Sequence, residues 1–464
     1  MKVSISGPLS VNLAQSLCQL YFPNEKFGVN ASADPEVSFV LVEANGEISA
    51  TVGISHKDNR ACAKASFPIS SLYTYKASAR IAAGTAFLDA AKQIFGYHPP
   101  WGMLTGIRSS KVALDLFARC GSKEETLRRL TDDYLITPHK ATLLIQTALY
   151  EKQVLQHHGE DTCALYISVP FCPTRCSYCS FVSYATPRLL SLLPQYMEKL
   201  NGDIVSIGQT IRNKGKRVST VYIGGGTPSI LSVKQIEELL SSVNLVAPDA
   251  EEVTFEAGRP DTITLEKMQV AQQGGVTRVC VNPQSTNDST LASIGRSHSA
   301  EDFFRAMEIV KQAGIPSINV DIIAGLPNEA PEAFCKTVDD VLSADPHSVT
   351  VHTFCVKKSS YEADSNQDLQ TEVQKVSESV DYSRSALESN GLLPYYMYRQ
   401  KKTVGNLENV GFAIPGHQCA YNAIMMSDVR DIYAVGAGAV TKIMIGGVAK
   451  RDFMPKYPYE YLSF

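Results

Sequence analysis

The chain has 464 residues, 44% of them hydrophobic and 19% charged, so it can form two or three domains with large buried cores. Its formal net charge of −4 argues against general binding of nucleic acids or membrane surfaces. Because residues 1–8 lack the pattern of a signal peptide, and no stretch approaches the roughly 18 consecutive apolar residues of a membrane helix, we expect a cytoplasmic protein.

Residues 1–155 are predicted to form an α+β domain. Candidate strands lie at Glu36–Glu43 and Gly46–Ser55. Apolar residues then recur at helical spacing in three segments, Ala77–Ile94, Lys111–Ala118 and Lys140–Glu151. A loop between the first two helices holds the single tryptophan. The region contains no cluster of catalytic residue types, so we assign it no role.

Residues 160–370 alternate between strand and helix patterns. The six predicted strands are Leu165–Val169, Val218–Ile223, Glu252–Phe255, Arg278–Val281, Ser317–Ile322 and Ser348–Thr353. The predicted helices between them are Pro187–Arg212, Val233–Val243, Leu265–Gln273, Ala300–Ala313 and Pro331–Ser343. This alternation implies parallel strands with right-handed crossovers. We therefore predict an α/β fold, an incomplete (open) parallel β/α barrel of about six units, followed by a mixed extension over residues 371–464.

Reactive residue types follow the predicted strands, which is where chemistry gathers in parallel barrels. Three cysteines follow the first strand, and the glycine triplet Gly224–Gly226 follows the second. Glu256 ends the third strand, and the fourth leads into Gln284. Asp321 lies at the end of the fifth strand, and His352 lies in the sixth. The shared position of these residues indicates one site.

The eleven cysteines are an odd, unevenly spaced set, which argues against a disulfide framework and favours a reducing compartment. Eight stand alone and are interpreted as small buried side chains, namely Cys18, Cys62, Cys120, Cys163, Cys280, Cys335, Cys355 and Cys419. The other three, Cys172, Cys176 and Cys179, can supply three thiolates to an iron–sulfur cubane and leave one iron open to a small molecule. The alternative is a zinc site closed by a distant cysteine or histidine.

The other strand-end residues suit a ligand at that open iron. Glycine triplets are often only tight turns, but beside an iron site their bare backbone offers N–H and C=O groups to an amine and a carboxylate. Ribose hydroxyls and a sulfonium cation would favour Glu256, Gln284 and Asp321 as acceptors. Arg296 can pair with a ligand carboxylate.

These motifs resemble the radical S-adenosylmethionine (SAM) superfamily, and within it the oxygen-independent coproporphyrinogen III oxidase group. The cysteine loop preceded by Tyr166–Phe171 is typical of the superfamily. Stretches typical of the group are Ile223–Pro228, Val253–Ala257, Arg278–Thr286, Gly295–His298, Asn319–Pro327 and Gly436–Ala439. Two further stretches, Trp101–Arg108 and Gly405–Asn409, resemble the HemZ-like branch of that group.

The resemblance implies the cofactors and the reaction. Cys172, Cys176 and Cys179 would hold a [4Fe–4S] cluster whose fourth iron binds SAM, and reductive cleavage of SAM would give a 5′-deoxyadenosyl radical. That radical would take a hydrogen from the β-carbon of a propionate, and loss of CO2 and an electron would leave a vinyl group. No catalytic residue is implied beyond the cluster and SAM. The residues at the SAM-contacting positions are Tyr166, Tyr178, Gly225, Gly226, Thr227, Glu256, Gln284, Arg296 and Asp321.

The implied partners are a tetrapyrrole substrate and an electron donor such as a flavodoxin or ferredoxin. The composition predicts no membrane partner and disfavours a nucleic acid. A porphyrinogen carries several propionates and needs cations around its rim. Arg399 and Lys401 follow the aromatic run Tyr395–Tyr398 and are the predicted substrate contacts, within a region 371–464 that covers the substrate. The alternative interpretation of these cations is a solvated charged turn.

Two residues depart from the pattern of the oxidases. Ser168 stands where those enzymes usually have histidine, and Arg259 replaces the usual neighbour of Pro260. Both changes leave the residues of the radical machinery intact and bear instead on the substrate.

Three functions remain open. The leading hypothesis is oxygen-independent decarboxylation of coproporphyrinogen III to protoporphyrinogen IX in haem biosynthesis. The second is a haem-carrying chaperone, since those proteins share the fold and cluster; of their His-Asn-x-x-Tyr-Trp motif, this chain keeps His417 and Tyr421 but not the Asn and Trp. The third is a radical SAM enzyme that acts on another tetrapyrrole or on RNA, which the net charge disfavours.

Overall fold

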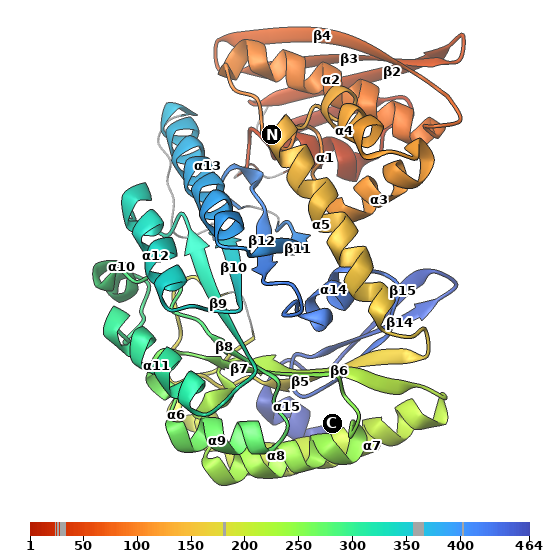
Figure 1. Ribbon diagram of the computed structural model, residues 1–464. Helices are drawn as coiled ribbons and strands as arrows, with labels where there is room; N and C mark the ends of the chain where they lie inside the picture. Colours follow the sequence, from red (N-terminus) through yellow and green to blue (C-terminus); the bar gives the residue numbers. More distant parts are fainter. Residues whose placement is uncertain (24, 26, 28–33, 180–181, 356–365, 401–402) are drawn as a thin grey trace. The chain divides into compact units, whose positions relative to one another are not determined.

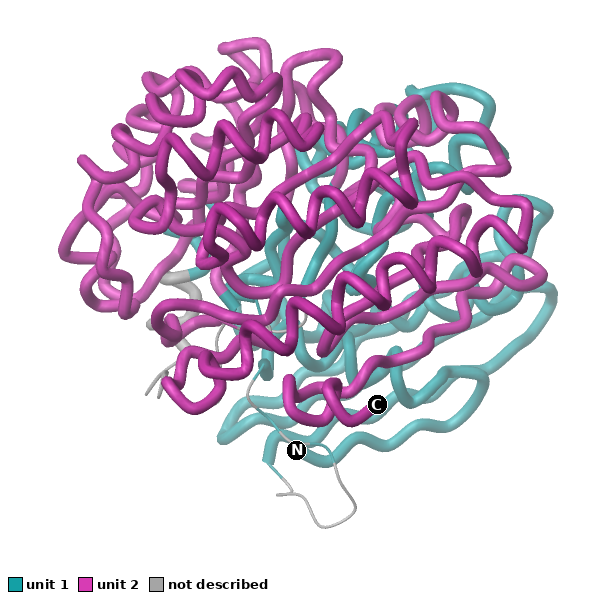
Figure 2. Tube along the Cα trace, turned by 90° about the horizontal axis from the view of Figure 1, so that it is seen from below, with its two compact units in different colours: residues 1–149, 355–377, 397–409 teal, residues 150–354, 378–396, 410–464 magenta. Residues whose placement is uncertain are grey.

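The computed structural model of the chain describes residues 1–464 except 24, 26, 28–33, 180–181, 356–365 and 401–402. The chain divides into two compact units, each assembled from separate stretches (Figure 2). Unit 1 comprises Met1–Leu149, Cys355–Ser377 and Met397–Asn409, and unit 2 comprises Tyr150–Phe354, Glu378–Tyr396 and Val410–Phe464. Most of the expected region 1–155 therefore lies in unit 1, whereas the expected extension 371–464 is divided between the two units.

Unit 1 contains a four-stranded sheet in the order β1-β2-β3-β4. The strands are β1 (Lys2–Ser6), β2 (Glu36–Ala44), β3 (Glu47–His56) and β4 (Asn59–Pro68). β1 runs parallel to β2, and the remaining pairs are antiparallel. Asn45 and Gly46 both have positive φ, 53° and 76°, which a two-residue hairpin turn requires. The two strands expected here are confirmed as β2 and β3, whereas the sequence pattern does not predict β1 and β4.

One face of this sheet packs against α2 (Tyr75–Phe95), which contacts β3 and β4. The helix is rich in alanine, so its backbone can approach the strands closely, and Phe87 stacks on Phe39 with ring centroids 5.8 Å apart. The other helices that begin in unit 1 before residue 150 are α1 (Val11–Cys18), α3 (Ser109–Cys120), α4 (Lys123–Asp132) and α5 (Pro138–His157), the last of which ends in unit 2.

Unit 2 is built on a sheet with the linear order β11-β12-β10-β9-β8-β7-β6-β5-β13-β14-β15. Its central strands are β5 (Thr162–Val169), β6 (Arg217–Gly225), β7 (Glu252–Gly258), β8 (Arg278–Val281), β9 (Ser317–Ala324) and β10 (Ser348–Thr353). Consecutive strands pair in parallel and in chain order. All six predicted strands are therefore confirmed, and the linear order makes the barrel an open one.

The crossover helices lie between these strands in the chain. They include α8 (Val233–Val246), α9 (Leu265–Gln273), α10 (Asp288–Ser293), α11 (Ala300–Gln312) and α12 (Pro331–Ser343). The single helix expected at Pro187–Arg212 is wrong, because the segment forms α6 (Pro187–Leu190) and α7 (Leu193–Asn213). Pro194 has no N–H for a continuous helix and lies instead in the first turn of α7, where no donor is needed. Figure 1 shows α7, α8 and α9 side by side, in agreement with their contacts.

The carboxy-terminal elements extend the sheet at both ends, which places the predicted mixed extension. At one end, β13 (Ile432–Val435) runs parallel to β5, and β14 (Val440–Ile445) and β15 (Val448–Phe453) continue antiparallel. At the other end, β12 (Asn409–Ala413) runs antiparallel to β10 and is followed by β11 (Leu393–Tyr398). The helices of this region are α13 (Asn366–Ser389), α14 (Ala420–Met426) and α15 (Pro458–Ser463). In the described part of the chain, no helix has both the length and the apolar character that crossing a membrane requires.

Candidate cofactor site

The cysteine loop begins just after β5 ends, as the barrel pattern predicts. Its backbone is held from outside the loop: the Cys172 N–H donates to the Tyr184 carbonyl at 3.0 Å, and the Ser177 N–H donates to the Ile294 carbonyl at 3.2 Å. All three cysteine side chains are half-buried. The loop is therefore held in place while its cysteines are neither fully buried nor fully exposed.

The thiols of this loop suit an iron–sulfur cluster. Burial raises the pKa of Cys172, a 3.3 Å hydrogen bond from the Thr227 hydroxyl opposes that rise, and the charges of Cys179 and Cys176 add to it. Cys176 and Cys179 thus lie close enough to Cys172 for their charges to act on it. Among the described residues, no three metal-ligating side chains already converge on one point. A set of three thiolates is nevertheless the donor set that leaves one iron of a cubane open, so the residues present fit the group.

Glycines at the end of β6 allow that strand to approach the cysteine loop. A Cβ at Gly226 would lie 2.4 Å from the carbonyl oxygen of Phe171, so any side chain at this position would collide with the loop backbone. Gly225 has φ +107°, which favours glycine. The Thr227 N–H donates to the Phe171 carbonyl at 2.7 Å. The predicted residues Gly226 and Thr227 therefore lie directly against the cysteine loop, and Gly225 lies against the end of β5.

Glu256 in β7 is a carboxylate with an unusual proton affinity. The Tyr222 hydroxyl donates to one of its oxygens, and the Asn282 amide donates to the other at 3.0 Å. Burial and the charge of Asp321 nevertheless raise the pKa of Glu256 to about 7. The side chain is therefore balanced between its charged and neutral forms near physiological pH, and a cationic ligand would favour the charged form.

Asp321 in β9 is the second carboxylate of the site. Burial acts to raise its pKa, but the hydrogen bond and charge of His352, 3.5 Å away, and the Asn319 amide at 2.8 Å lower that pKa on balance. Asp321 is thus the charged member of the pair. The two carboxylates give the strand ends a negative polarity that suits a cation such as a sulfonium.

Gln284 is held in a strained conformation that points to a ligand. Its φ is +71°, rare for a residue with a side chain. Its backbone N–H donates to the Asp321 carbonyl at 3.1 Å, and its carbonyl accepts from the Ile323 N–H at 2.9 Å. Its side-chain Oε1 is buried and has no hydrogen-bond partner among the described residues. Because buried acceptors are nearly always paired, this atom is a candidate ligand contact.

Tyr178 and Arg296 join the cysteine loop to the loop after α10. The Arg296 guanidinium donates to the Tyr178 hydroxyl oxygen from Nε at 3.2 Å and from Nη2 at 2.9 Å, and Nη1 donates to the Asn282 carbonyl at 2.8 Å. The predicted pair is therefore brought together, and Asn282 links it to Glu256. The sequence reasoning did not single out Asn282, because a lone asparagine after a strand carries no signal of its own.

Tyr166 belongs to a stack of three tyrosines. Its ring centroid lies 6.3 Å from that of Tyr222 and 6.0 Å from that of Tyr421, and the latter two rings are 4.5 Å apart. Through the hydroxyl of Tyr222 the stack reaches Glu256. The sequence did not predict Tyr222 as a site residue, because aromatic residues are common in buried strands. Tyr421 belongs to the segment 417–422, which was compared with the chaperone motif.

Ser168, at the position of the family histidine, has a structural role. Its hydroxyl donates to the Ala437 carbonyl at 2.8 Å, and the Tyr196 hydroxyl donates to the Ser168 carbonyl at 2.8 Å. A Cβ at Gly436 would lie 2.4 Å from that same carbonyl oxygen. The end of β5 therefore packs tightly against the glycine-containing stretch 436–439, and a small residue suits this position.

Comparison with known proteins agrees with this geometry. The sequence model described as "Radical SAM superfamily" matches residues 166–341. The chain is 33% identical over 385 residues to the Bacillus subtilis (strain 168) protein named oxygen-independent coproporphyrinogen-III oxidase-like protein HemZ, a match that covers 81% of this chain and 76% of that protein. The chain belongs to the radical SAM superfamily, in its HemZ-like branch. Its family uses a [4Fe–4S] cluster and SAM as cofactors.

Other similar proteins include both a chaperone and an oxidase. The heme chaperone HemW of Escherichia coli (strain K12) is 27% identical over 306 residues, which are 65% of this chain and 75% of that protein. The solved structure of E. coli coproporphyrinogen III oxidase (HemN), described as a radical SAM enzyme, matches with a TM-score of 0.51 and 21% identity, covering 68% of this chain and 71% of that one. That likeness supports the fold.

The predicted substrate contact Arg399 lies in the core of unit 1. It is 1% exposed, and its guanidinium donates to the carbonyls of Leu104 and, at 2.7 Å, of Asn406. It also lies over the Trp101 ring, 5.1 Å from the centroid. This burial does not suit a substrate contact, because a guanidinium held by backbone carbonyls in a core is not presented to a ligand. Lys401 lies outside the described residues.

The two stretches typical of the HemZ-like branch meet within unit 1. Glu408, from the second stretch, accepts from the Trp101 Nε1 of the first stretch and from the Lys140 Nζ, each at 2.6 Å. Burial would raise the pKa of Glu408, but the Lys140 charge and these hydrogen bonds lower it on balance. The branch stretches therefore build a buried charge cluster within unit 1.

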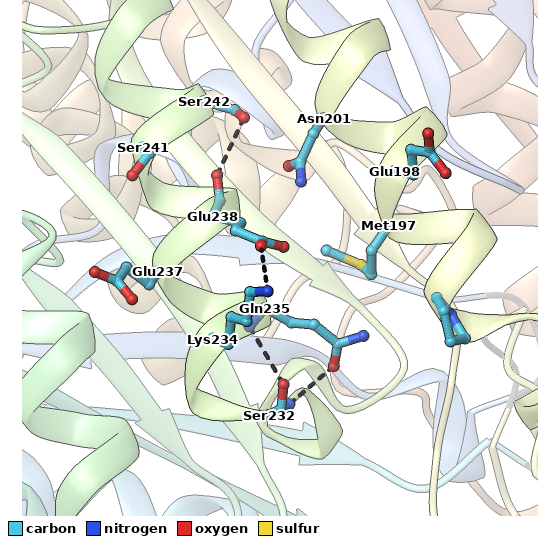
Figure 3. Close-up of a pocket in the computed structure, with 11 residues that line it drawn as sticks. Met197, Glu198, Asn201, Ser232, Lys234, Gln235, Glu237, Glu238, Ser241 and Ser242 are labelled. Carbon is cyan, nitrogen blue, oxygen red and sulfur yellow. Dashed lines mark hydrogen bonds and ion pairs between the residues drawn. The ribbon is translucent and has the colours of Figure 1, made fainter.

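A surface hollow of about 830 Å³ lies between α7 and α8, on the helical layer of unit 2 (Figure 3). In it Lys234 pairs with Glu238 at 3.7 Å on one helix face, and the Ser232 side chain caps α8. None of its lining residues is a predicted site residue. The hollow is accounted for by the packing of two helices.

Proposed function

We propose that this protein catalyses the oxygen-independent oxidative decarboxylation of coproporphyrinogen III propionates to vinyl groups, which forms protoporphyrinogen IX. One observation carries the proposal: three thiols, two acidic side chains and the unpaired Oε1 of Gln284 gather at neighbouring strand ends of a radical SAM barrel. When bound, the cluster and SAM supply a 5′-deoxyadenosyl radical. The choice of substrate rests on the names of the HemZ and HemN relatives.

The chain's own residues bind and orient the cofactors. Cys172, Cys176 and Cys179 would hold the cluster. The backbone at Gly225 and Gly226 offers N–H and C=O groups beside it, where no side chain fits. The negative polarity of Glu256 and Asp321 would favour the sulfonium and amino cations of SAM over a neutral product. Gln284 offers an acceptor to a hydroxyl, and Arg296 offers a donor to a carboxylate.

The proposed reaction also needs external electron carriers. For each propionate, the chemistry supplied by the bound cofactors would take one hydrogen atom from the β-carbon. The carboxyl group would then leave as CO2 and one electron would pass to an acceptor. The cluster requires one electron from a donor to cleave SAM, and we propose a flavodoxin or ferredoxin for that role. Thr174, Arg175 and Ser177 of the cysteine loop are exposed, so a protein donor can approach the cluster from this side.

An anaerobic assay tests the proposal. The cluster is reconstituted, and SAM, dithionite and coproporphyrinogen III are added with an electron acceptor. Formation of protoporphyrinogen IX together with 5′-deoxyadenosine supports the proposal. Formation of 5′-deoxyadenosine with no porphyrinogen turnover rejects the substrate and directs the search to other tetrapyrroles and to RNA. A Cys176→Ser variant is the control, since it retains the barrel residues but lacks one thiolate.

Haem carriage is the second candidate function, because HemW chaperones are among the similar proteins. Tyr421 of the partial chaperone motif stacks on Tyr222 and Tyr166 of the cofactor site. His417 instead packs against His347, with ring centroids 4.4 Å apart, at the beginning of β10. Stoichiometric haem binding that is lost in His417→Ala, with no porphyrinogen turnover, would favour the carrier.

A further inference from the structure

Arg259, one of the two departures from the oxidase pattern, lies at the centre of a buried hydrogen-bond cluster. The residue directly follows β7 and is 3% exposed. Its Nε and Nη2 donate to the two oxygens of Asp261, both at 3.0 Å, in a bidentate pair. This pair neutralises the guanidinium locally and fixes its plane.

The remaining donors of Arg259 reach two other loops. Nη1 donates to the hydroxyl of Thr174, which lies between the first two cysteines of the cluster loop. Nη2 also donates to the hydroxyl of Ser297 at 2.6 Å, and Ser297 directly follows Arg296. One guanidinium therefore connects the strand end of Glu256, the loop of the cysteines and the loop of Arg296.

The hydrogen bonds of Arg259 supplement a small number of direct hydrogen bonds between the cysteine loop and the loop of Arg296. The cysteine loop and the stretch 294–298 are not paired as strands. The hydrogen bonds described between them run from the Ser177 N–H and hydroxyl to the Ile294 carbonyl, and from Arg296 to the Tyr178 hydroxyl. Thr174 and Ser297 are themselves exposed, so the burial of Arg259 comes from its position beneath both loops. Removing its two outer hydrogen bonds would leave the direct bonds of Ser177 and Arg296 to hold the two loops together, so their spacing would be less firmly fixed.

We propose that Arg259 is a positioning residue that locks the cysteine loop to the Arg296 loop, so that the cluster and the carboxylate-binding arginine keep one fixed spacing for SAM. The inference rests on the cofactor half of the proposed function and not on the tetrapyrrole substrate. Lysine cannot replace it, because a single ammonium group lacks the planar fork that serves Asp261 and both hydroxyls together.

The test compares Arg259→Lys with Arg278→Lys as a matched control. Arg278 is also a buried arginine, 4% exposed, and pairs with Glu252 at 3.5 Å, but it lies at the beginning of β8, away from the strand ends that carry the site. Thermal unfolding of the apo protein, the iron content after reconstitution, and the SAM Kd from the change in the EPR signal of the reduced cluster are measured for each variant.

We expect Arg259→Lys to weaken SAM binding by about 10- to 100-fold, as loss of outer-shell partners does at metal sites. Arg278→Lys is expected to lower thermal stability while leaving the SAM Kd within about twofold. An unchanged SAM Kd in a folded, iron-loaded Arg259→Lys protein overturns the inference. Absence of SAM binding by the wild-type protein overturns the cofactor assignment itself, which separates the two failures.

Two milder variants keep the test decisive if Arg259→Lys does not fold. Thr174→Val and Ser297→Ala each remove one outer hydrogen bond from an exposed position. Each is expected to weaken SAM binding by about threefold to tenfold, since hydrogen bonds to a charged group are the stronger class. The combined variant is expected to approach the effect of Arg259→Lys. SAM affinity that is unchanged in the combined variant contradicts the inference.

Discussion

Two carboxylates, the buried Glu408 of unit 1 and the half-buried Glu256 of unit 2, are treated in opposite ways by their surroundings. Glu408 in unit 1 accepts from Lys140 and Trp101, and its pKa is lowered. Glu256 in unit 2 accepts from neutral groups, among them Tyr222 and Asn282, and its pKa is raised to about 7. Both carboxylates have a hydrogen bond on each oxygen, so the difference is one of charge compensation.

This difference distinguishes the side chains around Glu408, whose charges balance, from those around Glu256, whose charges do not. Lys140 compensates the charge of Glu408 within the fold, so the cluster can serve stability alone. The charge of Glu256 is compensated by no cation that the structure describes, while the neighbouring Gln284 Oε1 is unpaired. A bound cation such as the sulfonium of SAM would compensate the charge of Glu256.

The largest expected effect comes from removing a thiolate beside the incomplete cluster. Cys176→Ser should abolish the visible absorbance of the reconstituted cluster and all reductive cleavage of SAM, because a three-thiolate site has no thiolate to spare. Iron analysis and detection of 5′-deoxyadenosine measure the loss. Cys335→Ser, on the half-buried face of α12, is the control and should retain both. Full cleavage by Cys176→Ser would refute the assignment of the cluster.

The next largest effect is expected for the Lys140–Glu408 pair of unit 1. Glu408→Gln leaves the Lys140 ammonium buried without its carboxylate and should cost about 3–5 kcal/mol of unfolding free energy. Urea unfolding followed by the fluorescence of Trp101, the single tryptophan, measures the change. Lys140→Met combined with Glu408→Gln should recover much of the loss. A double variant no more stable than Glu408→Gln would contradict a charge-pair origin.

The pH dependence of stability tests the raised pKa of Glu256 in unit 2. The pKa of Glu256 is about 7 in the folded protein against its usual 4.5, so between these values the folded state binds more protons than the unfolded state. The unliganded protein should therefore lose stability as pH rises through that window, and Glu256→Gln should flatten this slope. Urea midpoints at about pH 5 and about pH 8 measure it. Identical slopes for both proteins would disprove the raised pKa.

The same carboxylate should report ligand binding. A cation bound beside Glu256 favours its charged form, so SAM binding near pH 7 should release up to about one proton. Calorimetric titrations in two buffers of different ionisation enthalpy measure the release, and Glu256→Gln should release less. Proton uptake on binding would show that the sulfonium does not compensate this carboxylate.

The smallest expected effect concerns Ser168. Ser168→Ala removes one buried hydrogen bond to the Ala437 carbonyl and should cost about 1 kcal/mol of stability, with the SAM Kd unchanged. Ser168→His, which restores the family residue, should cost more, because the neighbouring Gly436 and Gly225 leave no space for an imidazole. A stable Ser168→His protein would mean that the loop 436–439 can move aside.

The barrel was predictable because its signal is local. Short apolar runs alternate with helical patterns, and parallel strands bring every strand end to one edge, so Cys172, Glu256 and Asp321 could be placed together from the sequence. The long-range partners could not be placed. Arg259 meets residues 85 and 38 positions away, and Lys140 meets Glu408 across 268 positions. The spacing of these residues along the chain does not indicate that they are in contact. The sequence also does not indicate the core contacts of Arg399 with Leu104 and Trp101, so this cation was predicted to bind the substrate.

Unit 1 is made of stretches that lie far apart in the sequence, which has a consequence for its folding during synthesis. The last stretch of this unit ends at Asn409, so a growing chain has made nearly all of the cofactor barrel before the amino-terminal sheet and its helices acquire their final piece. Until then the Lys140 ammonium lacks the Glu408 carboxylate, and the nascent amino-terminal part stays in an incomplete state that chaperones can bind. An expression fragment that stops after residue 155 would be caught in that state permanently.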